Sequence, residues 1–162
     1  MSLFSRKPAT QDDALVELAV MFKSPELIAD NPTPGIELLD TSRLDFSVES
    51  LGLVDDYLDK MRKQKLDDEA TFKLILRCGA YVGEVILRNS HGKTYHWLEY
   101  AEALKVSKLI EQFGESVGTI AILWDSQTGL TFPLGKVMKF LENGREDSVQ
   151  FFAKAMLEKS GG

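Results

Sequence analysis

The sequence predicts an α+β fold, a single domain in which helices pack on a small antiparallel sheet of about three strands. Two observations lead to this prediction. Apolar residues recur at helical spacing along segments at both ends of the chain, and short runs of strand-forming residues lie between residues 93 and 132. A chain of 162 residues is also of the size that forms one domain.

The element expected to organise the domain is a long central helix over residues 67–91. Its apolar residues occupy most directions around the helix axis, as is typical of a helix surrounded by other elements. Acidic residues at its start and basic residues at its end suit the helix dipole. Gly79 and Gly83 share one face. Since a glycine costs about 1 kcal/mol relative to alanine in a helix interior, the pair indicates that another element packs closely there.

Residues 1–35 are predicted to form an N-terminal helical arm and a loop, which pack onto the main body. Thr10 or Asp12 is expected to cap the helix of this arm. The loop at residues 30–35 contains two prolines and a glycine, which exclude regular structure. Residues 1–9, which precede the helix, are predicted to be a frayed terminus.

Residues 36–159 are predicted to form the α+β core, and this core begins with an extended connection over residues 36–46. Ser47 is then expected to cap a helix that reaches residue 64. Because only a short turn separates this helix from the central one, the two helices are predicted to pair as an antiparallel hairpin.

The second half of the chain is predicted to mix strands and helices. Residues 117–124 are apolar on both faces, so they are interpreted as the buried central strand. A hairpin loop at residues 125–129 joins them to a return strand at residues 130–132. The remaining predicted strand is 93–98, and the predicted helices are 99–113, 134–141 and 147–158. Residues 160–162 are predicted to be a disordered tail.

Charge and composition limit the classes of function. A formal net charge of −6 argues against nucleic acid as the main partner, because phosphate binding requires a basic surface. No apolar run approaches the roughly 20 residues that span a bilayer, so no membrane span is predicted. Cys78 is the only cysteine, which excludes a disulfide within the chain and favours a reducing compartment. We therefore expect an acidic, cytoplasmic protein, and its oligomeric state stays open.

Two segments carry a resemblance to a known family. The first is GAYVGEVILRN at residues 79–89, which an aromatic strand follows, and the second is FPLGKVMKFLENGREDSV at residues 132–149. They resemble an uncharacterised family of bacterial cytoplasmic proteins of unknown function, and the resemblance covers roughly residues 44–152. It implies a bacterial, cytoplasmic protein and no particular activity. The segment between Trp97 and Val117 is longer than the resemblance leads us to expect.

A charged stripe on the central helix is the first candidate site. Glu84 lies among apolar residues, and helical spacing places it on one side with Arg77 and Arg88. Two interpretations are open: a structural ion pair at the edge of the core, or a cleft in which Arg77 and Arg88 bind an anionic ligand. The candidate ligand- or partner-binding residues are Arg77, Tyr81, Glu84, Arg88, His91, His96 and Trp97.

No catalytic residue, metal site or cofactor is assigned. His91 and His96 are the only histidines, and a spacing of five residues matches no metal-binding pattern. A carboxylate from Glu84 or Glu99 completing a two-histidine site is the weaker alternative. Cys78 has no acid–base set near it in the sequence and is interpreted as a buried, inert thiol. The chain has neither a phosphate-binding loop nor a serine-hydrolase motif.

Two classes of function are compatible with these observations. The favoured one is a protein–protein interaction module, such as an adaptor, a regulator or an immunity-type partner, because acidic charge and aromatic residues near the predicted sheet suit a protein partner. The alternative is a small-molecule-binding protein or enzyme that uses the polar stripe of Arg77, Glu84, Arg88 and His91. Convergence of these side chains in a cleft would favour the alternative, and an open face would favour the first class.

Overall fold

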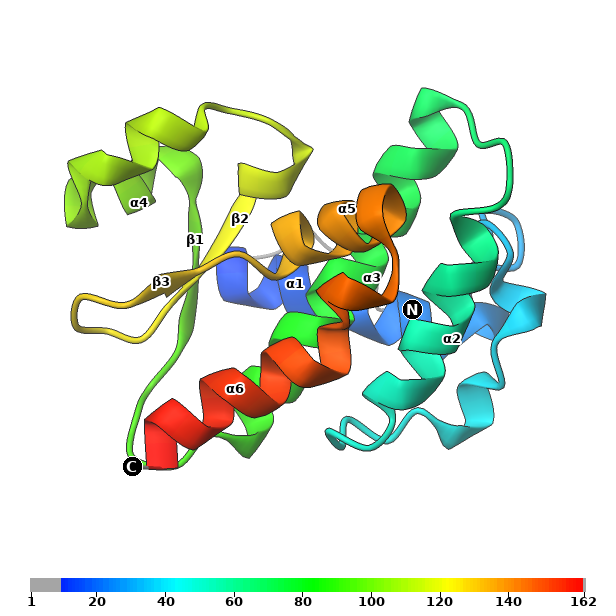
Figure 1. Ribbon diagram of the computed structural model, residues 1–162, viewed down its shortest axis with the longest axis horizontal. Coiled ribbons are helices and arrows are strands. Elements are labelled where there is room, and N and C mark those ends of the chain that lie inside the picture. Colours follow the sequence, from blue (N-terminus) through cyan, green and yellow to red (C-terminus); the bar gives the residue numbers. More distant parts are fainter. Residues whose placement is uncertain (1–9, 162) are drawn as a thin grey trace.

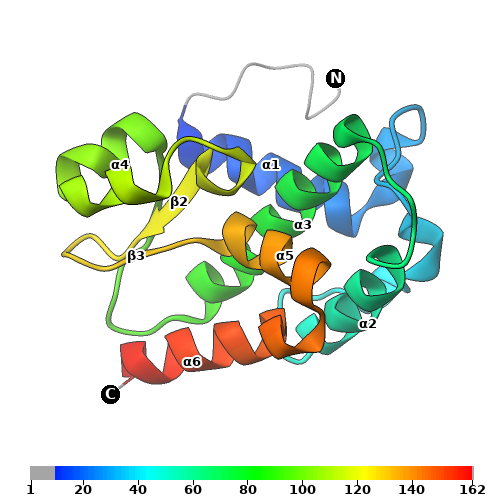
Figure 2. The ribbon, with the colours of Figure 1, turned by 45° about the horizontal axis from the view of Figure 1, so that its top comes forward.

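One long helix, α3 (Asp68–Asn89), runs through the middle of the structure, with α1 (Gln11–Lys23) on one side and α5 (Pro133–Asn143) and α6 (Val149–Gly161) on the other (Figures 1 and 2). This is the predicted α+β single domain with a long central helix. The computed structural model describes residues 10–161, with side chains as far as residue 158. Residues 1–9, predicted to be a frayed terminus, and residue 162 lie outside the described residues.

The central helix begins and ends within two residues of its predicted bounds. Asp67 is the N-cap, and its side chain accepts a hydrogen bond of 2.8 Å from the backbone N–H of Ala70. Nearly every residue from Leu74 to Ile86 is buried. The helix therefore belongs to the core on almost every side, as its apolar pattern predicts.

The two glycines of α3 mark the closest approaches in the core. A Cβ atom on Gly79 would lie 2.8 Å from the Cα of Leu134, at the start of α5. A Cβ atom on Gly83 would lie 2.1 Å from the ring of Trp97. The prediction that another element packs closely on this face is confirmed, and both contacts depend on the missing side chains.

The N-terminal helix α1 lies along α3. Thr10 caps it and accepts a hydrogen bond of 3.1 Å from the N–H of Asp13. Its buried residues Leu15, Ala19 and Phe22 belong to the same hydrophobic core as those of α3. A 3₁₀ helix, η2 (Pro25–Ile28), follows it.

Residues 36–46 are not extended, so this prediction is wrong. They form two 3₁₀ turns, η3 (Ile36–Leu38) and η4 (Thr41–Arg43). This segment is not part of the three-stranded sheet, so its backbone N–H and carbonyl groups form hydrogen bonds with residues nearby in the chain. The N–H of Leu39, for example, donates to the carbonyl of Ile36.

Helix α2 (Leu51–Met61) is shorter than predicted and has different neighbours. Ser47 caps the turn before it, accepting a hydrogen bond of 3.1 Å from the N–H of Ser50. The backbone of α2 packs against α5 and α6, and it does not form the predicted close hairpin with α3. The reason is Asp55, which accepts hydrogen bonds from the hydroxyl of Ser148 (2.6 Å) and the N–H of Val149 (2.8 Å). These bonds tie α2 to the start of α6.

The sheet has three antiparallel strands in the order β1-β2-β3, namely β1 (His96–Glu99), β2 (Ala121–Trp124) and β3 (Leu130–Thr131). The central position of the buried strand β2 is as predicted. All three strands are shorter than predicted, since β1 begins at residue 96 instead of 93, β2 begins at residue 121 instead of 117, and β3 ends at residue 131 instead of 132. Residues 117–119 form a 3₁₀ turn, η6 (Val117–Thr119), because the side chain of Ser116 caps it.

Other boundaries shift for local reasons. The helix predicted at residues 99–113 divides at Ser107 into α4 (Tyr100–Val106) and the 3₁₀ helix η5 (Lys108–Phe113), because the Ser107 hydroxyl accepts a hydrogen bond from the N–H of Leu109. Another 3₁₀ turn, η7 (Arg145–Asp147), precedes α6. That helix continues through Gly161, so two residues of the predicted tail are helical. Within residues 10–161, no helix is long and apolar enough to cross a membrane.

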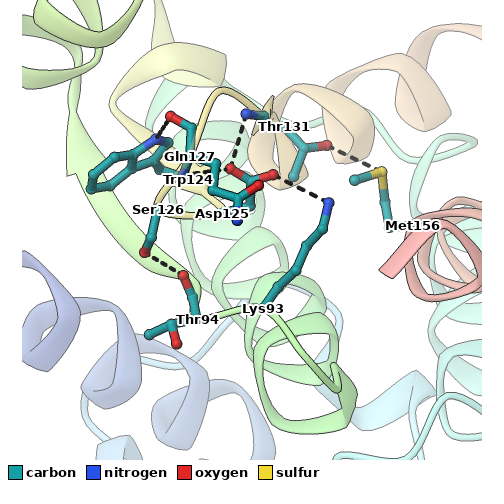
Figure 3. Close-up of polar contacts among 9 residues, drawn as sticks. Lys93, Thr94, Trp124, Asp125, Ser126, Gln127, Thr131 and Met156 are labelled. Carbon is teal, nitrogen blue, oxygen red and sulfur yellow. Dashed lines mark hydrogen bonds and ion pairs between the residues drawn. The ribbon is translucent and has the colours of Figure 1, made fainter. Parts of the chain in front are cut away.

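The hairpin loop predicted at residues 125–129 is present and is organised by Asp125 (Figure 3). One carboxylate oxygen accepts hydrogen bonds of 2.9 Å from the N–H groups of Gln127 and Gly129. The other lies 3.3 Å from the ammonium group of Lys93. Burial alone would raise the pKa of Asp125, but these donors outweigh it and hold the pKa below its usual value.

We expect Gly83→Ala to lower the free energy of unfolding by about 1–3 kcal/mol, because the rigid ring of Trp97 must move to admit the new methyl group. The matched control is Gly52→Ala in α2. Its new Cβ would meet only the flexible end of Gln150, at 3.4 Å, so the stability should stay the same or rise by up to about 1 kcal/mol. Chemical denaturation checks both variants. Equal stabilities would mean that the Trp97 contact does not limit packing.

We expect Asp125→Ala to cost about 1–3 kcal/mol of stability at neutral pH, because two loop N–H groups lose their acceptor. Asp125→Asn keeps one acceptor oxygen and should cost less. Since the folded pKa of Asp125 is lowered, its ionised form stabilises the fold above the usual pKa of an aspartate, and this contribution is lost as the pH falls through the folded value. Urea denaturation at several pH values should therefore show a weaker acid dependence in both variants than in the unmodified protein.

Candidate functional site

Arg77 holds a loop in place rather than facing a cleft. Its side chain is buried and donates hydrogen bonds to the carbonyl of Asn31 (2.8 Å) and to the hydroxyl of Thr33 (3.0 Å). Burial lowers the pKa of this guanidinium, yet both acceptors are neutral. Arg77 therefore anchors residues 30–35 to the central helix, apart from the rest of the stripe.

Tyr81 and Arg88 meet at Phe46. The hydroxyl of Tyr81 accepts a hydrogen bond of 3.0 Å from the N–H of Phe46 and shares one of 2.7 Å with the hydroxyl of Ser50. The rings of Tyr81 and Phe46 stack with their centroids 5.0 Å apart. The guanidinium of Arg88 lies 3.6 Å from the centroid of the Phe46 ring, which is a cation–π contact.

Glu84 supplies the carboxyl group of the stripe, and only 1% of its surface is exposed. It accepts a hydrogen bond of 3.0 Å from the indole N–H of Trp97, and its other oxygen lies 3.6 Å from the side chain of Arg88. Burial raises the pKa of Glu84, and the two partners only partly oppose this effect. Glu84, Trp97 and Arg88 are thus brought together, with Glu84 and Trp97 buried and Arg88 exposed.

A second carboxylate binds the backbone of the same tryptophan. Asp12, in the first turn of α1, accepts a hydrogen bond of 2.7 Å from the N–H of Trp97. Its other oxygen lies 3.0 Å from the ring of His96. Trp97 is therefore held by carboxylates from two helices, α1 and α3, at opposite ends of the residue.

His91 lies exposed beyond the end of α3, and His96 is held at Asp12, so the structure gives the two histidines different surroundings. Within the described part of the chain, no group of three or more His, Cys, Asp or Glu residues has an arrangement that could hold a metal ion. Burial raises the pKa of the Cys78 thiol, which favours its unreactive protonated form. None of the seven predicted site residues lines either of the two clefts described next.

A mainly apolar hollow, which we name the α5 cleft, lies between α5 and the segment from η5 to η6 and has a volume of about 400 Å³. Phe113 forms one wall, half exposed, with its ring centroid 5.1 Å from that of Phe132. The residues that line the cleft are Phe113, Ser116, Gly118, Thr119, Thr131, Phe132, Gly135, Lys136, Met138, Lys139, Glu142 and Phe152.

The rim of the α5 cleft combines apolar and basic side chains. Leu109 lies four residues before Phe113 on the same 3₁₀ helix, outside the lining of the cleft, and has 72% of its surface exposed. Lys136 forms an ion pair of 2.7 Å with Asp147, and this hydrogen bond lowers the pKa of Asp147. Lys139 is exposed at the rim. The cleft can therefore accept apolar groups, and its polar edge carries the ammonium group of Lys139 and the carboxylate of Glu142.

The second hollow, which we name the acidic hollow, adjoins the α5 cleft and has a volume of about 360 Å³. The two share Ser116 and Thr119 on the ridge at η6. Two exposed carboxylates, Glu99 and Glu115, give it negative charge. Its lining consists of Gln11, Glu99, Tyr100, Ala101, Glu115, Ser116, Thr119 and Ile120.

Sequence reasoning missed the exposed side chains of Leu109 and Phe113. The helix predicted over residues 99–113 is continuous, whereas the structure has a break at Ser107, and both side chains after it are exposed. The signal present in the sequence was Ser107 itself, since serine favours a helix N-cap over a helix interior. The aromatic residues near the sheet behave in the opposite way, since Tyr95 and Trp97 are buried.

No family model, no curated protein and no solved structure matches the chain. The resemblance to an uncharacterised bacterial family therefore stays a prediction.

We expect Glu84→Gln to stabilise the protein relative to the unmodified chain, increasingly so as the pH rises from about 4 to about 8. The folded pKa of Glu84 is raised, so its contribution is present below the usual pKa of a glutamate and is lost as the pH rises through the folded value. The glutamine oxygen can still accept the indole hydrogen bond from Trp97. Urea denaturation across this pH range measures the difference.

The matched control for this pH series is Glu111→Gln, which removes one negative charge from an exposed position. A Glu84→Gln difference that stays constant with pH, or that follows the control, would contradict a buried carboxylate with a raised pKa.

Proposed function

We propose that this protein is a protein–protein interaction module, an adaptor, regulator or immunity-type partner, that binds a segment of another protein at the α5 cleft. The observation that carries the proposal is the half-exposed ring of Phe113 in the wall of an open cleft with apolar walls, with the exposed side chain of Leu109 on the same 3₁₀ helix. Exposed aromatic and aliphatic groups at the rim of a cleft are typical anchors of protein interfaces.

The chemistry of the cleft defines the partner segment. Phe113, Phe132 and Met138 favour apolar side chains, because their exposed surface is removed from water on binding. Lys139 stands at the rim, so a carboxylate on the partner would lie beside a cation, whereas the protein as a whole carries a net charge of −6. The partner we propose is therefore an apolar segment that also carries an acidic residue.

The alternative function, a small-molecule site on the polar stripe, has less support. Arg77 contacts the loop at residues 30–35 and lies apart from Glu84 and Arg88. Glu84 and Arg88 contact each other, and they also contact the indole of Trp97 and the ring of Phe46, respectively. Arg77, Glu84 and Arg88, which were expected to converge on a ligand with His91, have their partners within the protein. This arrangement favours the structural interpretation of the stripe, and with it the interaction module.

The test is to capture partners from the native host with the unmodified protein, with Leu109→Ser/Phe113→Ser, and with the matched control Leu27→Ser. Leu27 is half exposed in η2, at the other end of α1 from the acidic hollow. A candidate is then purified and titrated against all three proteins. Removing two anchors should weaken binding at least about tenfold, while the control binds normally.

The melting temperatures of the three proteins should agree, because all the replaced side chains are exposed. A purified partner that binds Leu109→Ser/Phe113→Ser as well as the unmodified protein would contradict the α5 cleft as the binding surface.

A further inference from the structure

The two edges of the sheet differ in whether their backbone groups have partners. At the β1 edge, the N–H of Trp97 points away from β2 and donates a hydrogen bond of 2.7 Å to Asp12 on α1. The other edge is β3, which pairs with β2 alone. A strand edge presents a row of backbone donors and acceptors that can pair with another extended segment.

The register of the hairpin shows which groups of β3 face outward. The N–H of Asp125 donates to the carbonyl of Gly129 (3.0 Å), so these backbone groups face each other across the hairpin. The next pair along the hairpin is Trp124 with Leu130. Since hydrogen-bonded and non-hydrogen-bonded pairs alternate in an antiparallel ladder, the N–H and carbonyl of Leu130 point away from β2. The N–H of Phe132, two residues further, points the same way.

These outward groups have no partner within residues 10–158. In this range, no hydrogen bond joins the N–H or carbonyl of Leu130, or the N–H of Phe132, to another segment. Leu130 is partly exposed, and both ribbon views show β3 at the margin of the sheet (Figures 1 and 2). The β3 edge therefore offers a donor, an acceptor and a second donor in the spacing of a strand ladder.

The α5 cleft lies at this same margin. Its lining includes both Thr131 and Phe132, whose side chains point to opposite faces of the sheet. The hydroxyl of Thr131 lies 3.8 Å from the sulfur of Met156 on α6, whereas the ring of Phe132 contacts Phe113 on η5. A hollow that both residues line lies at the margin of the sheet and not over one face.

We infer that the partner segment binds in an extended conformation, as a strand added to the outer edge of β3, with its adjoining residues in the α5 cleft. The backbone groups of Leu130 and Phe132 supply the hydrogen bonds that hold it. In this mode of recognition the main chain gives affinity, and alternate side chains give specificity. The inference rests on the function proposed above, because it defines how the same partner segment binds.

The surroundings of the edge define the sequence of the segment. Alternate side chains of the added strand lie beside Phe132 and Phe113, which favours apolar residues at every second position. Lys139 is exposed about two turns along α5 from Phe132, so the acidic residue of the segment follows its strand. A helical segment would leave the outward groups of β3 without partners, because a helix satisfies its own backbone.

The experiment uses the full chain and a synthetic peptide, TVTVTVGD with blocked ends, in which valine alternates with threonine before an acidic residue. The matched control peptide has the same side chains and an N-methyl group on every valine and threonine amide, so it offers no backbone donors there. Amide hydrogen exchange of Leu130 and Phe132 is followed by NMR. Leu123, whose pairing places its N–H toward β3, is the reference within the chain.

We expect the amides of Leu130 and Phe132 to exchange quickly in the free chain and at least about tenfold more slowly at saturating peptide, while Leu123 stays slow throughout. The N-methylated peptide should leave all three rates unchanged. Leu130→Pro removes an outward donor, a change that edge strands tolerate, and should weaken peptide binding several-fold. If this variant does not fold, the comparison of the two peptides still decides the question.

Three outcomes would overturn the inference: slow exchange of both amides in the free chain, no protection at millimolar peptide, or equal protection by the two peptides. Protection that appears on concentrating the chain without peptide would also overturn it and would assign the edge to a second copy. No host partner is used. The peptide can therefore bind at β3 even if capture at Leu109 and Phe113 fails, and a captured partner can depend on those side chains even if the peptide does not bind.

Discussion

The packing of Trp97 on the glycine face of α3 is the contact on which the rest of the structure depends. The ring lies where a side chain on Gly83 would be, so β1 approaches the central helix more closely than any larger residue would allow. The indole N–H donates to the buried Glu84, and the backbone N–H donates to Asp12 on α1. One residue thereby joins the sheet to two helices.

The same close packing sets the shape of the candidate binding surface. Gly79 brings the start of α5 against the central helix, and Gly118 in η6 lies against Gly135 in α5, with 3.2 Å between a Cβ built on Gly118 and the Cα of Gly135. Because α5 and η6 meet at this point, the space beside them stays open as the α5 cleft. A rigid core thus supports a surface whose anchors, Leu109 and Phe113, are on a short 3₁₀ helix.

The charged side chains of the stripe on α3 make contacts within the protein. Arg77 binds neutral loop acceptors, Arg88 covers the ring of Phe46, and Glu84 is buried against Trp97. Burial raises the pKa of Glu84, so keeping its carboxylate ionised in this cluster costs free energy. The two hollows lie away from this stripe. Carboxylates line the acidic hollow, and apolar side chains with two lysines line the α5 cleft.

The sequence by itself determined the fold class, the central helix, the buried strand with its hairpin, and the close approach at Gly79 and Gly83, because each depends on local periodicity or on a residue with a special backbone property. It also identified Glu84 as a carboxyl that needs a partner, but not that Trp97 supplies the hydrogen bond. Only the tertiary structure decided which helices pair, since Asp55 binds the start of α6, far along the chain. It also decided that Leu109 and Phe113 are exposed. Helical periodicity assumes one continuous helix, but Ser107 caps a new 3₁₀ helix that starts at residue 108.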